Sequence, residues 1–528
     1  MTQSNSLCLH ARRRRAHAGT QPTAPRQADA APDEHRVPRL PATWLTAVTM
    51  AGAVLATVAL VAGCASPAGV APPSQAMLTP AQVGATAADT AWPRTDWWSA
   101  WGDAQLNALV DKALADQPSL RAVQARLVQA QAAVDVAGAA RKPQVNGSVN
   151  LTDQRYTENG IIPPPLAGAT KWNNDATISA SWELDLFGRQ RAALESAIGQ
   201  LRAAQADAQA ARVLLAGNVA IAYVNLGRVV EARDIARQAL GQREQTVSLV
   251  RQRIQSGLDT NVELRQAEGF IAQTQVELEA ADEAIARGRH ALAELTGQGP
   301  NALNDLSPRL AAVRAAALPA GLSADLLGRR ADLVAQRWRV EAATKDVAAA
   351  KAQFYPDINL VAFVGLSSIG LDNFIKSGSQ TYGIGPALRL PIFDGGRLRA
   401  NLASRNAEVD AAVDGYNGAL LRALREVADE VATLQSLERA QRAQDEATKS
   451  AESAYDLALQ RYRAGLGNFL IVLTAEQNVL TQRRASTDLK ARHLTAEATL
   501  ARALGGGWQG EPPPAPVLAQ GAGAAASH

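Results

Sequence analysis

Two kinds of hydrophobic pattern alternate along this chain, and each predicts a different element. Four segments alternate apolar and polar residues one by one, which is typical of strands with one apolar and one polar face. In one of them, Ile178 and Ala180 fall on one face, while Ser179 and Ser181 fall on the other. By this pattern we expect strands at about 144–152, 175–187, 357–366 and 381–393.

Long runs without proline follow each pair of predicted strands. Residues 188–256 and 397–464 are rich in alanine, leucine, glutamine, arginine and glutamate, which favour helix. A helix of ~65 residues is ~100 Å long, more than a soluble globular domain needs. A glycine turn and a returning helix follow each run, so we predict helical hairpins of coiled-coil character at about 188–296 and 396–504.

These elements occur twice in the same order. Matching positions share a spacing of 208 residues, namely Arg189 and Arg397, Gly257 and Gly465, and Glu268 and Glu476. This period is longer than that of solenoid repeats, so we interpret the chain as two copies of one large unit. We place the copies at 92–298 and 324–504, with a linker at 299–323 and a Gly-, Pro- and Ala-rich tail at 505–528 that we expect to be disordered.

The N-terminal region resembles a targeting segment. An uncharged, mostly apolar run from about 44 to 62 follows Arg36 and Arg39, and small residues end it, as in a secretory signal. The ending "VAGC" resembles a bacterial lipobox, in which a diacylglycerol alkylates the cysteine and the chain is cut before it. We therefore predict a signal peptide at 1–63; the alternative is an uncleaved membrane anchor, since about 19 residues nearly span a bilayer.

Cys64 is then the first residue of the mature chain, with an S-diacylglycerol on its thiol and an acyl chain on its amine. Residues 64–91 are small and proline-rich, so we expect an extended, lipid-anchored linker. An aspartate after the cysteine would favour retention in the inner membrane, whereas Ala65 permits the outer membrane. The leader is long, and we expect translation to start near Val37.

Four amphipathic strands cannot cross a membrane by themselves. Only helices and closed barrels leave no backbone group unpaired in lipid, and the smallest transmembrane barrels have about eight strands. Strands of about ten residues are long enough to span, so other copies of the chain must complete the barrel. Three copies would give about twelve strands, although composition alone does not choose a trimer over a dimer.

Several motifs resemble the TolC-like outer-membrane efflux factors, in the lipidated branch that serves resistance-nodulation-division pumps. "WWSAWGDAQLNALVDKAL" resembles the opening helix of that family, "LPAGLSADLLGRRADLVAQRW" its inter-repeat segment, and "LPIFDGGRLRA" its second strand-to-helix corner. The resemblance spans about 92–504. Ala331 departs from it, because the family commonly has proline there, and we expect no functional effect from this departure.

The resemblance implies an α+β membrane protein of a Gram-negative bacterium. In a homotrimer, four strands per chain would form an outer-membrane β-barrel of about twelve strands, continuous with a long periplasmic α-helical barrel. The implied function is a passive duct that takes small toxic molecules from an inner-membrane pump, through a periplasmic adaptor, to the exterior. An outer-membrane duct for type I protein secretion is the alternative with the same fold. A periplasmic coiled-coil scaffold is a third hypothesis, and it would not need the paired strands.

The resemblance also places the two helical turns at the periplasmic tips of the duct, where the family touches the adaptor. It predicts that Gly257, Leu258, Gly465 and Leu466 contact the adaptor through exposed leucines. Ordinary helix capping is the alternative for the glycines, which can adopt a left-handed backbone.

Candidate constriction residues lie beside these turns, namely Asp259, Glu263, Arg265 and Tyr462. Glu263 stands where the family often has a pore-facing aspartate, and Tyr462 matches a gate tyrosine of the family. Residues 260–263 also fit a capping box, in which Glu263 would return to the backbone of Thr260. In the second repeat the two acidic positions of the family are occupied by Ile471 and Thr474, so the usual acidic ring is incomplete.

The strand-to-helix corners are interpreted as structural. They contain Phe187, Gly188, Phe393, Gly395 and Gly396. Glycine lets the chain turn from strand to helix, and aromatic side chains suit the membrane interface.

Composition argues against catalysis and against nucleic-acid binding. The net charge is only +3, and the one dense basic run lies in the leader. The six histidines lack metal-ligand spacing, and no phosphate-binding loop or nucleophile elbow occurs. We expect no enzyme, no metal and no cofactor besides the covalent lipid on Cys64.

Overall fold

The structure is a computed structural model, and it describes residues 66–79, 81–83, 94–313, 330–508 and 510. All of them belong to the unit Cys64–His528. The predicted signal peptide, Cys64, the second part of the inter-repeat linker and most of the predicted tail lie outside the described residues.

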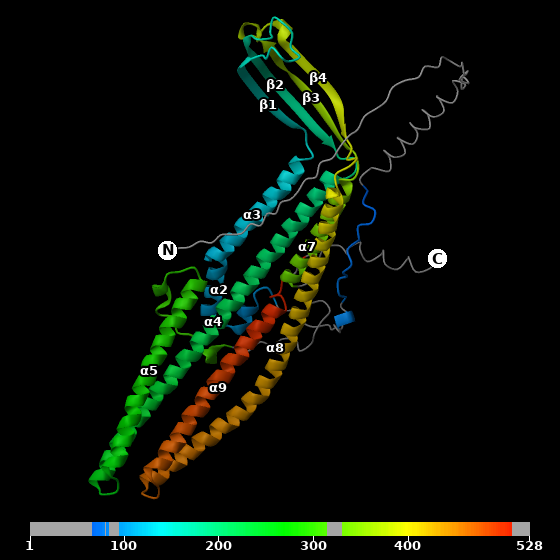
Figure 1. The fold of residues 1–528 in the computed structure, drawn as a ribbon. Coiled ribbons are helices and arrows are strands. Elements are labelled where there is room, and N and C mark those ends of the chain that lie inside the picture. Colours follow the sequence, from blue (N-terminus) through cyan, green and yellow to red (C-terminus); the bar gives the residue numbers. More distant parts are fainter. Residues whose placement is uncertain (1–65, 80, 84–93, 314–329, 509, 511–528) are drawn as a thin grey trace, which may run out of the picture. The chain divides into compact units, whose positions relative to one another are not determined.

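Four strands form one antiparallel sheet in chain order (Figure 1). They are β1 (Gln144–Arg155), β2 (Thr170–Leu184), β3 (Asp357–Ile369) and β4 (Gln380–Arg389). The backbone pairing continues beyond the alternating pattern, because the polar start of β2 pairs with the end of β1. β4 ends at Arg389 rather than near 393, where Pro391 has no amide to donate to a ladder.

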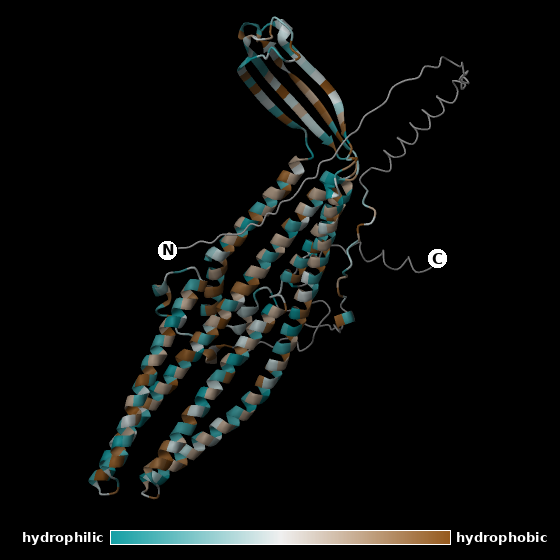
Figure 2. Ribbon diagram, in the orientation of Figure 1, coloured by the Kyte–Doolittle hydropathy of each residue, from teal (hydrophilic) through white to brown (hydrophobic). Residues whose placement is uncertain are grey.

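The register of the sheet aligns residues of one kind across neighbouring strands. Ile178 of β2 lies opposite Val364 of β3, and Val364 lies opposite Tyr382 of β4. One residue along, Ser179 lies opposite Asn146 of β1. Side chains alternate between the faces of a strand, so one face of the sheet is largely apolar and the other largely polar. Figure 2 shows hydrophobic and hydrophilic positions following one another along the strands.

The helices make up the rest of each repeat. The first repeat has α3 (Pro118–Ala139), α4 (Arg189–Gln255) and α5 (Asn261–Leu295); the second has α7 (Ala331–Ala352), α8 (Arg397–Arg463) and α9 (Phe469–Ala503). α4 and α8 have 67 residues each, so each is ~100 Å long. The helical turns therefore lie far from the sheet (Figure 1). The predicted duplication and the predicted order of elements are confirmed.

Short elements complete the fold. They are α2 (Ala104–Asp116) and the 3₁₀ turns η1 (Ala81–Val83), η2 (Trp97–Trp101), η3 (Pro300–Leu303), η4 (Leu310–Ala312), η5 (Leu371–Asn373) and η6 (Ser377–Ser379). The tryptophans of η2 and the apolar face of α2 pack on α4 and α9 in the largest apolar cluster. Small residues allow close packing elsewhere: a Cβ on Gly199 of α4 would lie 3.0 Å from the Cβ of Ala342 of α7.

The first described residues lie along α8 as an extended strap, which we define as residues 70–78. Three side chains of α8 hold its backbone: Asn406 bonds to Ala71, Asp410 to Ser74 and Gln75, and Asn417 to Ala76 and Leu78. The strap and α8 run in the same direction, because later residues of the strap bond to later residues of α8. The N-terminal end of the strap therefore points towards the start of α8 and the strand-to-helix corner.

Candidate functional site

The two helical turns have the same backbone. Gly257 and Gly465 have φ of 72° and 76°, in the left-handed region that favours glycine. The N–H of Gly257 donates to the carbonyl of Ile254 at 2.9 Å, and that of Leu258 donates to Arg253, also at 2.9 Å. This pair of bonds is the Schellman motif, and the turn after α8 repeats it. Both glycines therefore cap their helices.

The residue after each glycine is an exposed leucine. Leu258 is 61% exposed and Leu466 is 71% exposed. In many Schellman motifs this residue packs back on its own helix, but here each side chain stands largely in solvent. Each turn thus presents an apolar side chain to solvent.

The returning helices α5 and α9 begin with different caps. Thr260 and Glu263 form a capping box: the Glu263 carboxylate accepts from the Thr260 N–H at 2.9 Å, and Thr260 Oγ1 accepts from the Val262 N–H at 3.2 Å. The hydrogen bonds from Thr260 lower the pKa of Glu263. In α9 the side chain of Asn468 accepts from the N–H of Ile471 at 3.1 Å. Two roles were predicted for Glu263, capping and lining the pore. The hydrogen bonds of its carboxylate are those of a helix cap.

Asp259 lies in a network that joins the two hairpins, which we call the tip latch: Arg253, Asp259 and Tyr462. Arg253 Nε lies 2.8 Å from the Asp259 carboxylate, and the Tyr462 hydroxyl donates to the same carboxylate. Arg253 also donates to the Tyr462 carbonyl at 2.8 Å, and its guanidinium carbon lies 4.3 Å from the Tyr462 ring centre. The latch therefore ties the turn of one hairpin to the last helical turn of α8.

The charges of the tip latch compensate one another. Burial disfavours the charge of Asp259, but hydrogen bonds from Arg253 and Tyr462 outweigh it and hold the pKa of Asp259 below its ordinary value of 3.8. Burial, together with the bond to Asp259, raises the pKa of Tyr462. At neutral pH the latch combines a carboxylate, a guanidinium and a neutral phenol, so it adds no net charge to the tip.

The structure brings together two of the four candidate constriction residues, Asp259 and Tyr462. Arg265 stands apart from them and pairs with Glu268 of its own helix at 2.8 Å. Arg253 was not predicted from the sequence. The local signal for it is an arginine in the last turn of α4, six residues before an aspartate that follows the helix.

Two glycine corners join the sheet to the long helices. Gly188, with φ of 76°, precedes α4, and Gly396, with φ of 90°, precedes α8. Gly395 also has a positive φ, 66°, so the chain can turn sharply. Phe187 stacks on Tyr355 at 4.8 Å between ring centres, and Phe393 is 89% exposed.

Sequence analysis missed the carboxylates that cap α4 and α8 at these corners. Asp185 accepts from the N–H of Gln190 at 3.0 Å and from that of Arg191 at 2.7 Å. Asp394 accepts from the N–H groups of Gly396 and Leu398. An acidic residue just before the first helical turn is a local capping signal that was available in the sequence.

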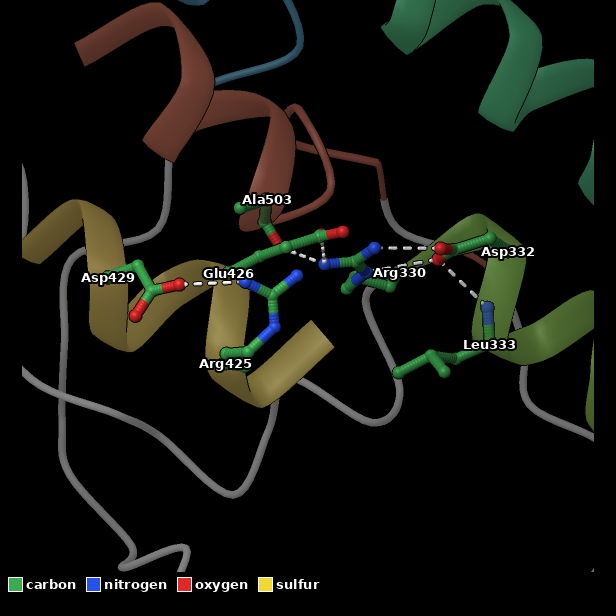
Figure 3. A network of polar contacts seen from close by, with 7 residues as sticks. All are labelled: Arg330, Asp332, Leu333, Arg425, Glu426, Asp429 and Ala503. Atoms are coloured by element: carbon green, nitrogen blue, oxygen red, sulfur yellow. Dashed lines mark hydrogen bonds and ion pairs between the residues drawn. The ribbon is translucent and has the colours of Figure 1, made fainter. Parts of the chain in front are cut away.

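A buried arginine, Arg330, links helices of the second repeat (Figure 3). Arg330, just before α7, donates to Asp332 at 2.7 Å, to Glu426 of α8 at 2.9 Å and to the carbonyl of Ala503 of α9 at 3.0 Å. Burial opposes its charge, but the two carboxylates outweigh burial and raise the pKa of Arg330. The quoted inter-repeat motif thus contains a structural joint between three helices.

Among the described residues, no group of His, Cys, Asp and Glu side chains is arranged to hold a metal ion. The candidate site consists of the turns and the side-chain links between helices described above.

Comparison with known proteins matches each repeat separately. The family model described as "Outer membrane efflux protein" matches residues 109–298 and 322–506. The fusaric acid resistance protein FusA of Burkholderia cepacia is 40% identical over 370 residues, which are 68% of this chain and 70% of that protein. The multidrug resistance outer membrane protein MdtP of Escherichia coli K12 is 32% identical over 474 residues, which are 87% of this chain and 96% of that protein.

Solved structures agree with this match. The outer membrane protein VceC of Vibrio cholerae is 37% identical with a TM-score of 0.74, covering 79% of this chain and all of that one (100%). The MtrE channel of Neisseria gonorrhoeae, solved in an open state, is 28% identical with a TM-score of 0.72, covering 83% and 97%. Because the family model matches more than half of its residues, the chain belongs to the outer membrane efflux protein family, whose members are TolC-like channels and not enzymes.

Proposed function

We propose that this protein is the outer-membrane channel of a tripartite efflux system, which exports small toxic molecules in series with an inner-membrane resistance-nodulation-division pump and a periplasmic adaptor. The main observation in support is a four-stranded sheet with one exposed apolar face. It is continuous with two helical hairpins, whose long helices α4 and α8 are each ~100 Å long. Val149, Ile178, Val364 and Ile384 on that face are all more than half exposed. The names of FusA and MdtP, which refer to resistance, favour small-molecule cargo.

The functional unit in this proposal is a homotrimer. β1 and β4 are the edges of the sheet and pair on one side only within the chain, so other copies are needed to close a barrel. α3 supports the same conclusion: none of its residues is buried, and Val128 and Val136 are 62% and 71% exposed. Three copies would form a barrel of about twelve strands, with the polar face lining the lumen.

Lipidation of Cys64 is also proposed, and the strap supports it. Ala71 is bonded to Asn406, nine residues after the start of α8, which corresponds to ~14 Å along the helix. The seven residues from Ala71 back to Cys64 include a turn in which the N–H of Val70 donates to the carbonyl of Pro67 at 3.3 Å, and with this turn they can span up to ~20 Å. The cysteine can therefore reach the corner where α8 meets β4, beside the exposed side chain of Phe393. That corner is the membrane boundary of the proposed barrel, where acyl chains would enter the bilayer.

The tips are proposed to bind the adaptor through Leu258 and Leu466, with Gly257 and Gly465 shaping the turns. The tip latch is proposed to hold the periplasmic end closed, because it ties the two hairpins of one chain together. Glu263 is proposed to cap α5, and Arg265, which pairs with Glu268, is not part of the tip latch.

The experiment is complementation of a strain that lacks its own efflux channel but has a compatible pump and adaptor. The expected result is restored resistance to small toxic compounds, with heat-modifiable trimers in the outer-membrane fraction. Export of a protein substrate without any gain in resistance would favour type I secretion. A protein that remained in the periplasm without trimers would favour the coiled-coil scaffold.

A further inference from the structure

A buried ion pair lies between the two hairpins, away from their turns. Arg243 of α4 and Glu476 of α9 approach to 3.3 Å, and each residue is only 6% exposed. Arg243 also donates to the Phe270 carbonyl of α5 at 3.0 Å and to the Thr274 hydroxyl. One guanidinium therefore joins three helices that come from both hairpins.

The Arg243–Glu476 pair lies at a fixed distance from the turns of the hairpins. Arg243 precedes Arg253 of the tip latch by ten residues, or ~15 Å of helix. An apolar cluster lies at the tips of both hairpins: Val247, Val250, Ala267, Ala458, Tyr462, Phe469, Val472 and Leu473. We call the part of the hairpins from this level to the turns the tip segment. The tip latch holds it at the turns, and the ion pair bounds it at the other end.

A gain in stability does not account for this buried pair. Burial raises the pKa of Glu476 above its ordinary value of 4.5, although Arg243 favours the charged form. The charged carboxylate is therefore disfavoured at this place. Buried ion pairs can often be replaced by apolar residues without loss of stability, and their best-attested role is to define a register between elements.

We propose that Arg243 and Glu476 form a pivot: they fix α9 to α4 and α5 at one register, so that opening of the periplasmic end is confined to the tip segment. This inference rests on the proposed function as a channel whose periplasmic end opens. Both are positioning residues, because they act through the helices that they join. Once the tip latch breaks, the apolar contacts of the tip segment separate, while the contacts beyond the pivot persist.

Single cysteines on either side of the pivot test this directly. Val250 and Ala236 lie seven residues to each side of Arg243 on the same face of α4, and they are 0% and 3% exposed. In trimers with the latch broken by Tyr462→Phe, a charged maleimide should label V250C about tenfold faster than in latched trimers, while A236C stays protected. Adding R243M and E476L together should increase the labelling of A236C by about tenfold as well, without lowering the thermal stability of the trimer.

Controls separate a pivot from general loosening. Glu268 is the counterpart of Glu476 at the 208-residue spacing, and it pairs with Arg251 on the surface at 3.1 Å, so R251Q with E268Q should leave both labelling rates unchanged. The parent without an engineered cysteine sets the background of the labelling, because Cys8 belongs to the predicted signal peptide and the thiol of Cys64 is proposed to carry the lipid. Glu476→Gln keeps the shape of the side chain and serves if the double variant does not assemble; it should raise A236C labelling about threefold.

Equal protection of A236C with and without the ion pair would overturn the pivot. Efflux measured with the same variants keeps that result separate from the proposed function. Trimers that still confer resistance show that the channel works even if the pivot is wrong. Loss of resistance from the parent itself would instead reject the channel.

Discussion

Helices α3 and α7 occupy the same place in the two repeats and have the same length, 22 residues. α7 buries nine of its residues, and its apolar face packs against α8, whereas α3 buries none. The duplication thus gives both repeats a helix of the same length at this place. The neighbours that cover the two helices within the chain are different. Burial depends on which helices lie beside it, and the exposed α3 is best explained by a neighbouring copy of the chain.

The two hairpins show the same contrast at the level of single side chains. Their helices have equal lengths, 67 and 35 residues, and their glycine turns have the same hydrogen bonds. The position of Asp259 in the first hairpin is taken by Gly467 in the second, and that of Glu263 by Ile471. The first hairpin supplies the acid of the tip latch and the second supplies Tyr462. The two hairpins have the same backbone but different side chains at matching positions. These differences allow the two hairpins to bond to each other.

The largest effect is expected at the exposed leucines. Leu258→Glu should reduce efflux to the level of a strain without the channel, because a charge replaces an apolar contact with the adaptor. Leu466→Glu tests whether the second hairpin contributes equally. Drug susceptibility and the amount of outer-membrane trimer are measured together. If trimers disappear in parallel with resistance, the leucines are structural and the adaptor contact is wrong.

Breaking the tip latch should come next. Asp259→Ala leaves Arg253 without its carboxylate partner at a cost of about 3 kcal/mol, which corresponds to about a hundredfold larger open fraction. Single-channel conductance of reconstituted trimers measures this fraction. Arg265→Gln, an exposed charge on the same hairpin, is the control and should have no effect. An unchanged conductance in Asp259→Ala would show that the latch does not hold the channel closed.

Removing a helix cap should have a smaller effect on stability than breaking the tip latch. Thr260→Ala removes one side of a reciprocal capping box, and Asn468→Ala removes a single cap, each at a cost of about 1 kcal/mol. Hydrogen exchange at the first turns of α5 and α9 measures both effects. We expect faster exchange at α5 in the first variant and at α9 in the second. Equal acceleration at both helices in either variant would mean that the tips unfold as one unit.

Asp259 and Glu476 should respond to acid in opposite ways. The pKa of Asp259 is lowered, so the stability from its latch is present above pH 3.8 and is lost only as the pH falls through its lower folded value. The pKa of Glu476 is raised above 4.5, so the penalty for its charge is relieved as the pH falls through that higher value. Thermal unfolding of Asp259→Asn and Glu476→Gln against the parent between pH 7 and 4 measures this. The Glu476→Gln difference should change over that range, and the Asp259→Asn difference should not.

The smallest effect concerns the starts of α3 and α7. α3 begins with Pro118, whereas α7 begins with Ala331. Arg330 has φ of −98° and ψ of 118°, the extended conformation that a residue before proline prefers. Ala331→Pro should therefore stabilise the trimer by about 0.4–1 kcal/mol in thermal unfolding, with no change in efflux. Destabilisation would show that the buried site of Ala331 has no room for the ring.

The local features of the fold could be predicted from the sequence because their causes are local. The pleat of a strand imposes the alternation of Ile178 and Ser179, and a left-handed turn favours glycine at 257 and 465. The absence of proline allowed two very long helices, and the 208-residue spacing revealed the duplication. The polar start of β2 was missed because strand pairing with β1, and not alternation, defines it.

Tertiary structure decided which side chains meet. Asp259 and Tyr462 are 203 residues apart, and no pattern along the chain indicates that they share a hydrogen bond. Glu268 and Glu476 are equivalent in the sequence, yet one pairs on the surface and the other is buried against Arg243. Helical periodicity determines which residues share a face. Which helix covers that face depends on the packing of whole hairpins, so the latch and the buried pair exist only in the folded chain.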